Sequence, residues 1–124
     1  MIEQKPKEQS QRQRRVAELV RQIVAEKLAK GETQNPSLGS HITVTRVEVS
    51  KDIKHAKVFF TPLLQNSDHK QLTEELNLEA PLLSRQLGKQ MHTKYTPRLR
   101  FYYDESYESA QRLESIIRDI RDDA

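Results

Sequence analysis

The residues of this chain that could do chemistry are cations gathered in one stretch, Pro81 to Tyr103. The stretch holds five basic residues and no acidic one: Arg85, Lys89, Lys94, Arg98 and Arg100. Fixed cations without neighbouring carboxylates are suited to binding phosphate groups, so the stretch predicts a surface for a polyanion. The alternative is a solvated basic face with no ligand, and charge alone does not exclude it.

Other cations extend this candidate surface. Arg12 and Arg15 crowd the start of a predicted N-terminal helix, where positive charge opposes the helix dipole and therefore indicates phosphate contact. A solvated arm would explain these two arginines nearly as well. Lys51 and Lys54 lie at the tip of a predicted hairpin, where their side chains are expected to be exposed.

A histidine and a tyrosine are further candidates for binding RNA. His92 follows Arg85 and Lys89 at helical spacing and is predicted to extend their basic stripe. In the next predicted strand, Tyr102 shares the parity of Arg98 and Arg100, opposite to the apolar Leu99 and Phe101. Its ring is therefore expected on the polar face, where it could stack on a base. An ordinary surface tyrosine remains an equal alternative.

No pattern in the chain supports catalysis. Cysteine is absent, which excludes a thiol nucleophile, a disulfide and a thiolate metal site. The histidines at positions 41, 55, 69 and 92 fall in different predicted elements without metal-ligand spacing, and three glycines are too scattered for a phosphate loop. We therefore expect no enzyme, no cofactor, no metal and no small-molecule substrate.

The totals indicate one small domain with segregated charge. A chain of 124 residues without a long apolar run predicts a cytoplasmic protein with no membrane partner, and we expect a monomer. The formal net charge is +3, but residues 104–124 contain seven acids against three arginines. This segregation favours a nucleic-acid-binding protein; the alternative class is an interaction adaptor that docks through its acidic C-terminal helix.

Periodicity predicts the elements in order. We expect a disordered tail over residues 1–10 and a single RNA-binding domain over 11–121. Within it, the pattern predicts a helix from Gln11, strands over 41–50 and 56–61 forming a hairpin, a short helix after Asp68, a second helix from Pro81 to about Thr96, a strand over 98–103 and a last helix. The apolar residues change parity between Val44 and Val47, which predicts a bulge near Thr45.

The last helix is expected to bury one side. Its predicted buried face consists of Tyr107, Ala110, Leu113, Ile116, Ile117 and Ile120. The long connection between the second and third strands is sufficient for a parallel return. The predicted fold is therefore α+β, with a three-stranded mixed sheet and helices packed on one face.

Five motifs follow one another between roughly Arg12 and Ile120. They are RQRRV at 12–16, NPSLG at 35–39, VEVSKDIKHAKV at 47–58, LGKQM at 87–91 and LRFYYDES at 99–106. Together, in this order, they resemble the motifs of the bacterial ribosome-binding factor A family. The chain differs from the family pattern at Asn35 and Ser37, where the family has aspartate and arginine.

The resemblance implies a fold and a function. The fold would be a KH-like domain of the second type, in which a helical kink written Ala-x-Gly replaces the GxxG loop; here the kink reads Ala80-Pro81-Leu82. Leucine stands where glycine is expected and lacks its backbone freedom. The function would be late maturation of the free 30S subunit by binding near the 5′ end and neck of 16S rRNA, with a role in rRNA processing and in growth in the cold.

Overall fold

The computed structural model describes residues 9–64, 67–93 and 95–122 of the chain. The elements, in chain order, are α1 (Gln11–Ala29), a short 3₁₀ helix (Leu38–His41), β1 (Ile42–Val49), β2 (His55–Pro62), α2 (His69–Gln90), β3 (Arg98–Tyr103) and α3 (Glu105–Asp122). The sheet runs in the order β1-β2-β3.

The sheet is mixed, as the sequence predicts. β1 pairs with β2 in antiparallel orientation, and β2 pairs with β3 in parallel orientation. The predicted bulge is confirmed, because Val44 pairs with Phe60 and Arg46 pairs with Phe59, which leaves Thr45 as the extra residue. The predicted α+β class with a three-stranded mixed sheet is therefore correct.

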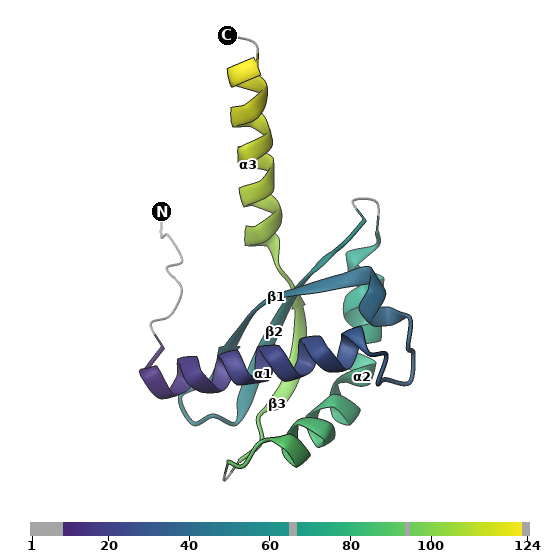
Figure 1. Ribbon diagram of the computed structural model, residues 1–124, viewed down its shortest axis with the longest axis vertical. Helices are drawn as coiled ribbons and strands as arrows, with labels where there is room; N and C mark the ends of the chain where they lie inside the picture. Colours follow the sequence, from purple (N-terminus) through teal and green to yellow (C-terminus); the bar gives the residue numbers. More distant parts are fainter. Residues whose placement is uncertain (1–8, 65–66, 94, 123–124) are drawn as a thin grey trace.

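Two helices cover one face of the sheet. α1 packs mainly on β1, and α2 packs on β3 (Figure 1). The core between them includes the predicted stripe of α1, represented by the buried Val20 and Val24, and the buried strand residues Val58 and Phe101. Leu19 departs from the predicted stripe, since 40% of its surface is exposed.

α1 has a well-defined beginning and end. Ser10 caps it, because the Ser10 hydroxyl accepts from the Gln13 backbone N–H and the Gln13 side chain accepts from the Ser10 N–H. At the other end Gly31 takes a φ of +69°, which glycine adopts without strain. Residues 1–8 of the predicted disordered tail lie outside the described residues, whereas Gln9 is hydrogen-bonded to the Val49 carbonyl.

α2 corrects the predicted break between two helices. It is one helix of 22 residues with Pro81 in its interior. Proline lacks the N–H that would bond to the Asn77 carbonyl, and its ring displaces that carbonyl, so a bend is expected. Figure 1 shows the first and second parts of α2 running in different directions. Pro81 itself is exposed.

The same helix ends earlier than predicted. α2 stops at Gln90, and the following Met91 is extended, with ψ of 127°. The prediction that His92 continues the helical stripe of Arg85 and Lys89 is therefore wrong, although His92 is exposed. Met91 itself is buried, and its burial turns the chain toward β3.

Two polar side chains of α2 bind the outer edge of β3. The Phe101 N–H donates to Asn77 Oδ1 at 2.8 Å, and Asn77 Nδ2 donates to the Phe101 carbonyl at 3.1 Å. The Leu99 N–H donates to Ser84 Oγ at 3.2 Å. Asn77 and Ser84 lie two helical turns apart on one side of α2. Their side chains therefore provide hydrogen-bond partners for backbone groups at the outer edge of β3.

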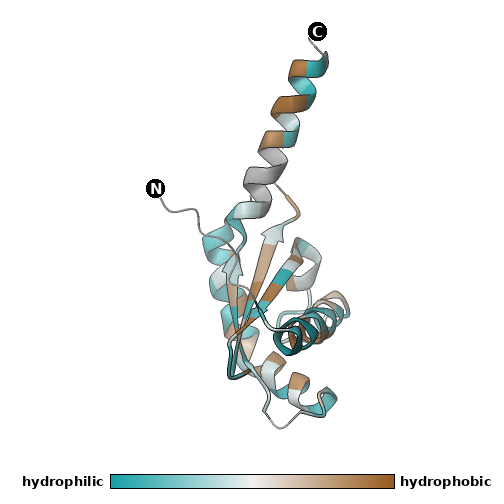
Figure 2. Cartoon of the chain, turned by 90° about the vertical axis from the view of Figure 1, so that its left-hand side faces the viewer, coloured by the Kyte–Doolittle hydropathy of each residue, from teal (hydrophilic) through white to brown (hydrophobic). Residues whose placement is uncertain are grey.

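α3 does not pack on the sheet, contrary to the prediction. Its apolar residues Leu113, Ile116, Ile117 and Ile120 are 59, 55, 41 and 66% exposed, and the side chains of Tyr107 and Ala110 lie outside the described part of the chain. Only Asp104 separates β3 from α3, and its N–H still donates to the Phe60 carbonyl. The chain has no turn in which to reverse, so α3 projects away (Figures 1 and 2).

The contrast between α2 and α3 predicts unequal effects of truncation. Leu83→Ala removes a side chain that is 2% exposed and should lower the free energy of unfolding by about 2–5 kcal/mol. Ile120→Ala on α3 should change it by about 0.5 kcal/mol or less. Urea unfolding of both variants measures the difference. A loss of similar size for the two variants would mean that α3 packs against the domain after all.

Candidate nucleic-acid interface

The face of the sheet opposite α1 and α2 carries a group of basic side chains. Along β3, Leu99 and Phe101 are buried, so the alternate residues Arg98 and Arg100 are exposed on the opposite face. The parallel register places His55 of β2 beside Arg98 and Lys57 beside Arg100. We call these four the open-face basic residues: His55, Lys57, Arg98 and Arg100.

Aromatic rings adjoin the open-face basic residues. Phe59 pairs with Tyr102 in the next register position, and their ring centroids are 5.7 Å apart. Lys57 Nζ lies 5.6 Å and Arg100 Cζ 5.8 Å from the Tyr102 centroid. Cations and rings together are the combination with which proteins bind single-stranded nucleic acid, through phosphate contact and base stacking.

The bulge organises the far end of this face. Arg46 lies over the Phe59 ring at 3.9 Å and forms ion pairs with Glu48 and with Asp104, whose carboxylate oxygen is 3.4 Å from Arg46 Nε. Asp104 is 3% exposed and also accepts from the hydroxyls of Thr45 and Ser106. One buried carboxylate therefore joins the bulge of β1 to the start of α3.

The hairpin tip holds its two lysines outward by burying an isoleucine between them. Ile53 is 3% exposed and has φ of +62°, a conformation that is strained for a β-branched residue. The Ser50 hydroxyl and the Lys54 N–H both donate to the Asp52 carboxylate, and these bonds lower the pKa of Asp52. Lys51 and Lys54 are exposed on either side of the tip, as predicted.

The hairpin tip and the beginning of β3 meet at one end of the sheet. The Arg98 N–H donates to the Lys54 carbonyl at 2.8 Å, and Lys54 Nζ lies 5.8 Å from the Tyr95 ring. This contact places Lys54 beside the open-face basic residues. Lys94, another predicted contact, lies outside the described residues.

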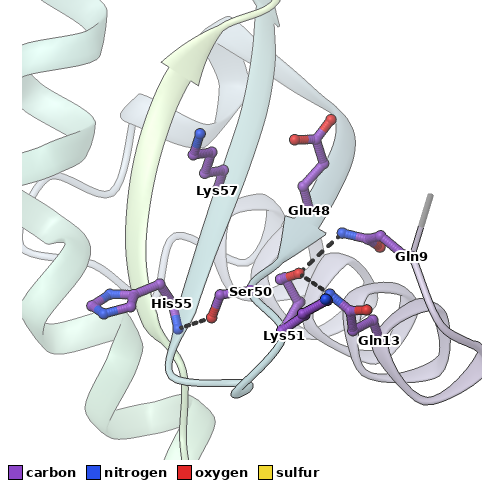
Figure 3. Close-up of a pocket in the computed structure, with 8 residues that line it drawn as sticks. Gln9, Gln13, Glu48, Ser50, Lys51, His55 and Lys57 are labelled. Atoms are coloured by element: carbon purple, nitrogen blue, oxygen red, sulfur yellow. Dashed lines mark hydrogen bonds between the residues drawn. The ribbon is translucent and has the colours of Figure 1, made fainter. Parts of the chain in front are cut away.

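A hollow of about 540 Å³ opens where the start of α1 meets the hairpin (Figure 3). The side chains of Gln9 and Gln13 close one wall, because both amide groups donate to the Val49 carbonyl, at 3.1 and 2.9 Å. Glu48, Lys51, His55 and Lys57 also line the hollow, and Lys51 lies beside Gln13. The hollow therefore has three basic side chains and one acidic side chain in its lining, and it shares His55 and Lys57 with the open face.

The basic residues of α2 occupy a different side of the domain. Arg85 and Lys89 are exposed, as predicted, but α2 lies against the helix-covered face and the edge of β3. Arg12 and Arg15 are exposed at the start of α1. The predicted cations thus lie on the open face, on the hairpin end and on the outer sides of two helices.

Ion pairing separates these candidates from the other cations. In α1 and just after it, Arg21, Lys27 and Lys30 form ion pairs with Glu18, Glu32 and Glu26, respectively. Within the described ranges, no carboxylate lies within ion-pair distance of the predicted cations: Arg12, Arg15, Lys51, Lys54, Arg85, Lys89, Arg98 and Arg100. Their charge is available to an anionic ligand.

Sequence reasoning missed part of the open face. His55, Lys57 and Phe59 share strand parity opposite to the buried Ala56 and Val58, so alternation could have placed them on the exposed face of β2 but not beside the arginines of β3. Arg46 could not have been placed in this way, because the bulge changes parity just before it. The β2 residues become candidates only once the register with β3 is known.

The described part of the chain offers little for other chemistry. In residues 9–64, 67–93 and 95–122, no three histidine or acidic side chains gather as metal ligands would. None of the helices in those ranges combines the length and the apolar character needed to cross a membrane.

Comparison with known proteins identifies relatives along most of the chain. The model of the family described as "Ribosome-binding factor A" matches residues 12–117. A protein of that name from Methylobacterium radiotolerans is 39% identical over 113 residues, which cover 90% of this chain and 79% of the relative. Another, from Coxiella burnetii, is 43% identical over 108 residues, 87% of this chain and 88% of the relative.

A solved structure supports the fold independently. The crystal structure of ribosome-binding factor A from Thermus thermophilus superposes with a TM-score of 0.62. The alignment covers 73% of this chain and 94% of that protein, at 21% sequence identity. At that identity the likeness establishes the shared fold.

Proposed function

The chain belongs to the ribosome-binding factor A family, and on that premise we propose that it binds the free 30S ribosomal subunit and its precursors through 16S rRNA. The proposal places its contact near the 5′ end and the neck of that RNA, in the late maturation and processing steps that support growth in the cold. The protein would act by binding alone, as a cytoplasmic monomer, without a catalytic step or a cofactor.

The observation that supports RNA as the ligand is the set of cations without carboxylate partners. The chain has 18 acidic residues against 21 lysines and arginines, and carboxylates pair with the cations at Arg21, Lys27 and Lys30. Exposed cations left unpaired on the open face and on α2 suit a ligand with regularly spaced phosphates. Folded RNA provides such spacing together with a shape that a rigid sheet can match.

The test of the proposed function is sedimentation with ribosomal particles. The protein should sediment with free small subunits and not with fully assembled ribosomes. If about five phosphates are neutralised, log K should fall against log salt with a slope of roughly −3.5 to −4.5. A binding constant that does not respond to salt would contradict phosphate contact, and absence from the subunit fractions at low salt would contradict the function.

Charge reversal on α2 should weaken subunit binding specifically. Arg85→Glu with Lys89→Glu should leave the fold intact, because both side chains are exposed, and should weaken binding by more than tenfold. Each lost phosphate contact should also lower the salt slope by nearly one unit.

The matched control for this pair is Arg118→Glu with Arg121→Glu, two exposed arginines on α3. It makes the same change in net charge and should weaken binding far less. Equal weakening by the two double variants would show that net charge, rather than the α2 surface, governs binding.

A second candidate function is a protein-interaction adaptor that docks through α3. The observation that favours it is the exposed row of Leu113, Ile116 and Ile120 on a helix that leaves the domain. Ile116→Gln with Ile120→Gln discriminates the two functions, since it removes the apolar row and leaves every unpaired cation in place. Loss of subunit association with unchanged affinity for isolated 16S rRNA would favour the adaptor.

A further inference from the structure

Tyr102 lies among side chains that project from the open face of the sheet. Its ring is tilted by 31° to that of Phe59, with 5.7 Å between the centroids. Lys57 and Arg100 flank it at 5.6 and 5.8 Å. A ring is therefore held between a second ring and two cations, on a face that neither α1 nor α2 covers.

Tyr102 and Phe59 differ in what lies over them. The Arg46 guanidinium covers the Phe59 ring at 3.9 Å, and Arg46 is held there by its ion pairs with Glu48 and Asp104. The cations beside Tyr102 stand farther from its ring, and neither has an ion-pair partner among the residues that the structure describes. A ligand can therefore reach Tyr102 more readily than Phe59.

Building on the proposed function, we propose that Tyr102 stacks on an unpaired base of the bound RNA, while Lys57 and Arg100 contact the adjoining phosphates. Every base has a flat π-face, so such a contact needs no particular sequence. The open face would then hold a short single-stranded segment within an otherwise folded RNA.

The spacing of the open face suits this ligand. Residues two apart on a strand are separated by about 6.6 Å, and neighbouring strands by about 4.8 Å. Arg98 and Arg100 therefore repeat along β3 at a distance comparable to that between successive phosphates of an extended chain. The register places Tyr102, Lys57 and His55 in order toward the hairpin. Lys57, His55 and Lys51 also line the hollow there (Figure 3).

A ring at the centre of the basic group favours RNA over other polyanions. An anionic membrane or a phosphorylated peptide would use the cations, but it has no base to place on Tyr102. Stacking also predicts an energetic signature that charge does not share, because ring contact is insensitive to salt whereas phosphate contact releases counterions.

The test uses the full chain and a single-stranded RNA decamer that carries one 2-aminopurine, whose fluorescence is quenched on stacking. Tyr102→Thr keeps a strong strand former and removes the ring; it should abolish the quenching and weaken binding roughly 5- to 150-fold. Tyr102→Phe should retain both. The salt slope should stay unchanged in Tyr102→Thr and fall by nearly one unit in Arg100→Gln.

The control is Leu63→Thr, which removes an exposed apolar side chain just after β2 and should change affinity less than twofold. Thermal melting of each variant checks the fold; if Tyr102→Thr is unfolded, Tyr102→Leu keeps apolar bulk without the ring and takes its place. An unquenched wild-type complex, a folded ringless variant that binds within twofold of wild type, or equal losses at Leu63 and Tyr102 would overturn the inference.

Sedimentation with free small subunits, run on the same wild-type sample, separates the two proposals. Wild type that sediments with subunits but gives no Tyr102-dependent quenching overturns the stacking contact and leaves the proposed function standing. Wild type that does not sediment with subunits contradicts the proposed function itself.

Discussion

The parallel pairing of β2 with β3 is the constraint on which the rest of the structure depends. Parallel strands cannot be joined by a tight turn, so the chain between them must cross over, and α2 makes that crossover. The same register divides the side chains between two faces. It buries Leu99 and Phe101 under α2 and sets Arg98 and Arg100 beside the basic residues of β2. The core and the candidate interface are therefore two results of one pairing.

α2 meets this constraint by bending. Pro81 removes the intrahelical partner of the Asn77 carbonyl, and the Asn77 side chain is the one that binds both backbone groups of Phe101. The bend and the shielding of the β3 edge thus occur at neighbouring points of one helix. Asn77 and Ser84 thus provide partners for both backbone groups of Phe101 and for the Leu99 N–H at this edge.

Local pattern predicted most of the fold, because side-chain alternation and apolar periodicity reflect burial directly. The parity change after Val44 predicted the bulge for that reason.

Two predictions failed because longer-range geometry determines the structure at those points. Periodicity predicted a buried face for α3, but the single residue Asp104 between β3 and α3 leaves no turn to fold it back. Pro81 suggested a break, yet the buried Leu76 and Leu83 on either side hold the helix together. For the site, local charge found Arg98 and Arg100, whereas their β2 neighbours required the register.

The open face brings like charges together on neighbouring strands. Like charges on neighbouring strands repel one another, so placing Lys57 beside Arg100 lowers the stability of the sheet. Carboxylates at those positions would have removed the repulsion, as Glu18 and Glu26 do for the cations of α1. Glu48 of β1 lies opposite Lys57 of β2 in the strand register, but its carboxylate forms an ion pair with Arg46 instead. In the proposed complex, the phosphates of the RNA would offset this repulsion, so part of the stability that the sheet lacks in the free protein would contribute to affinity.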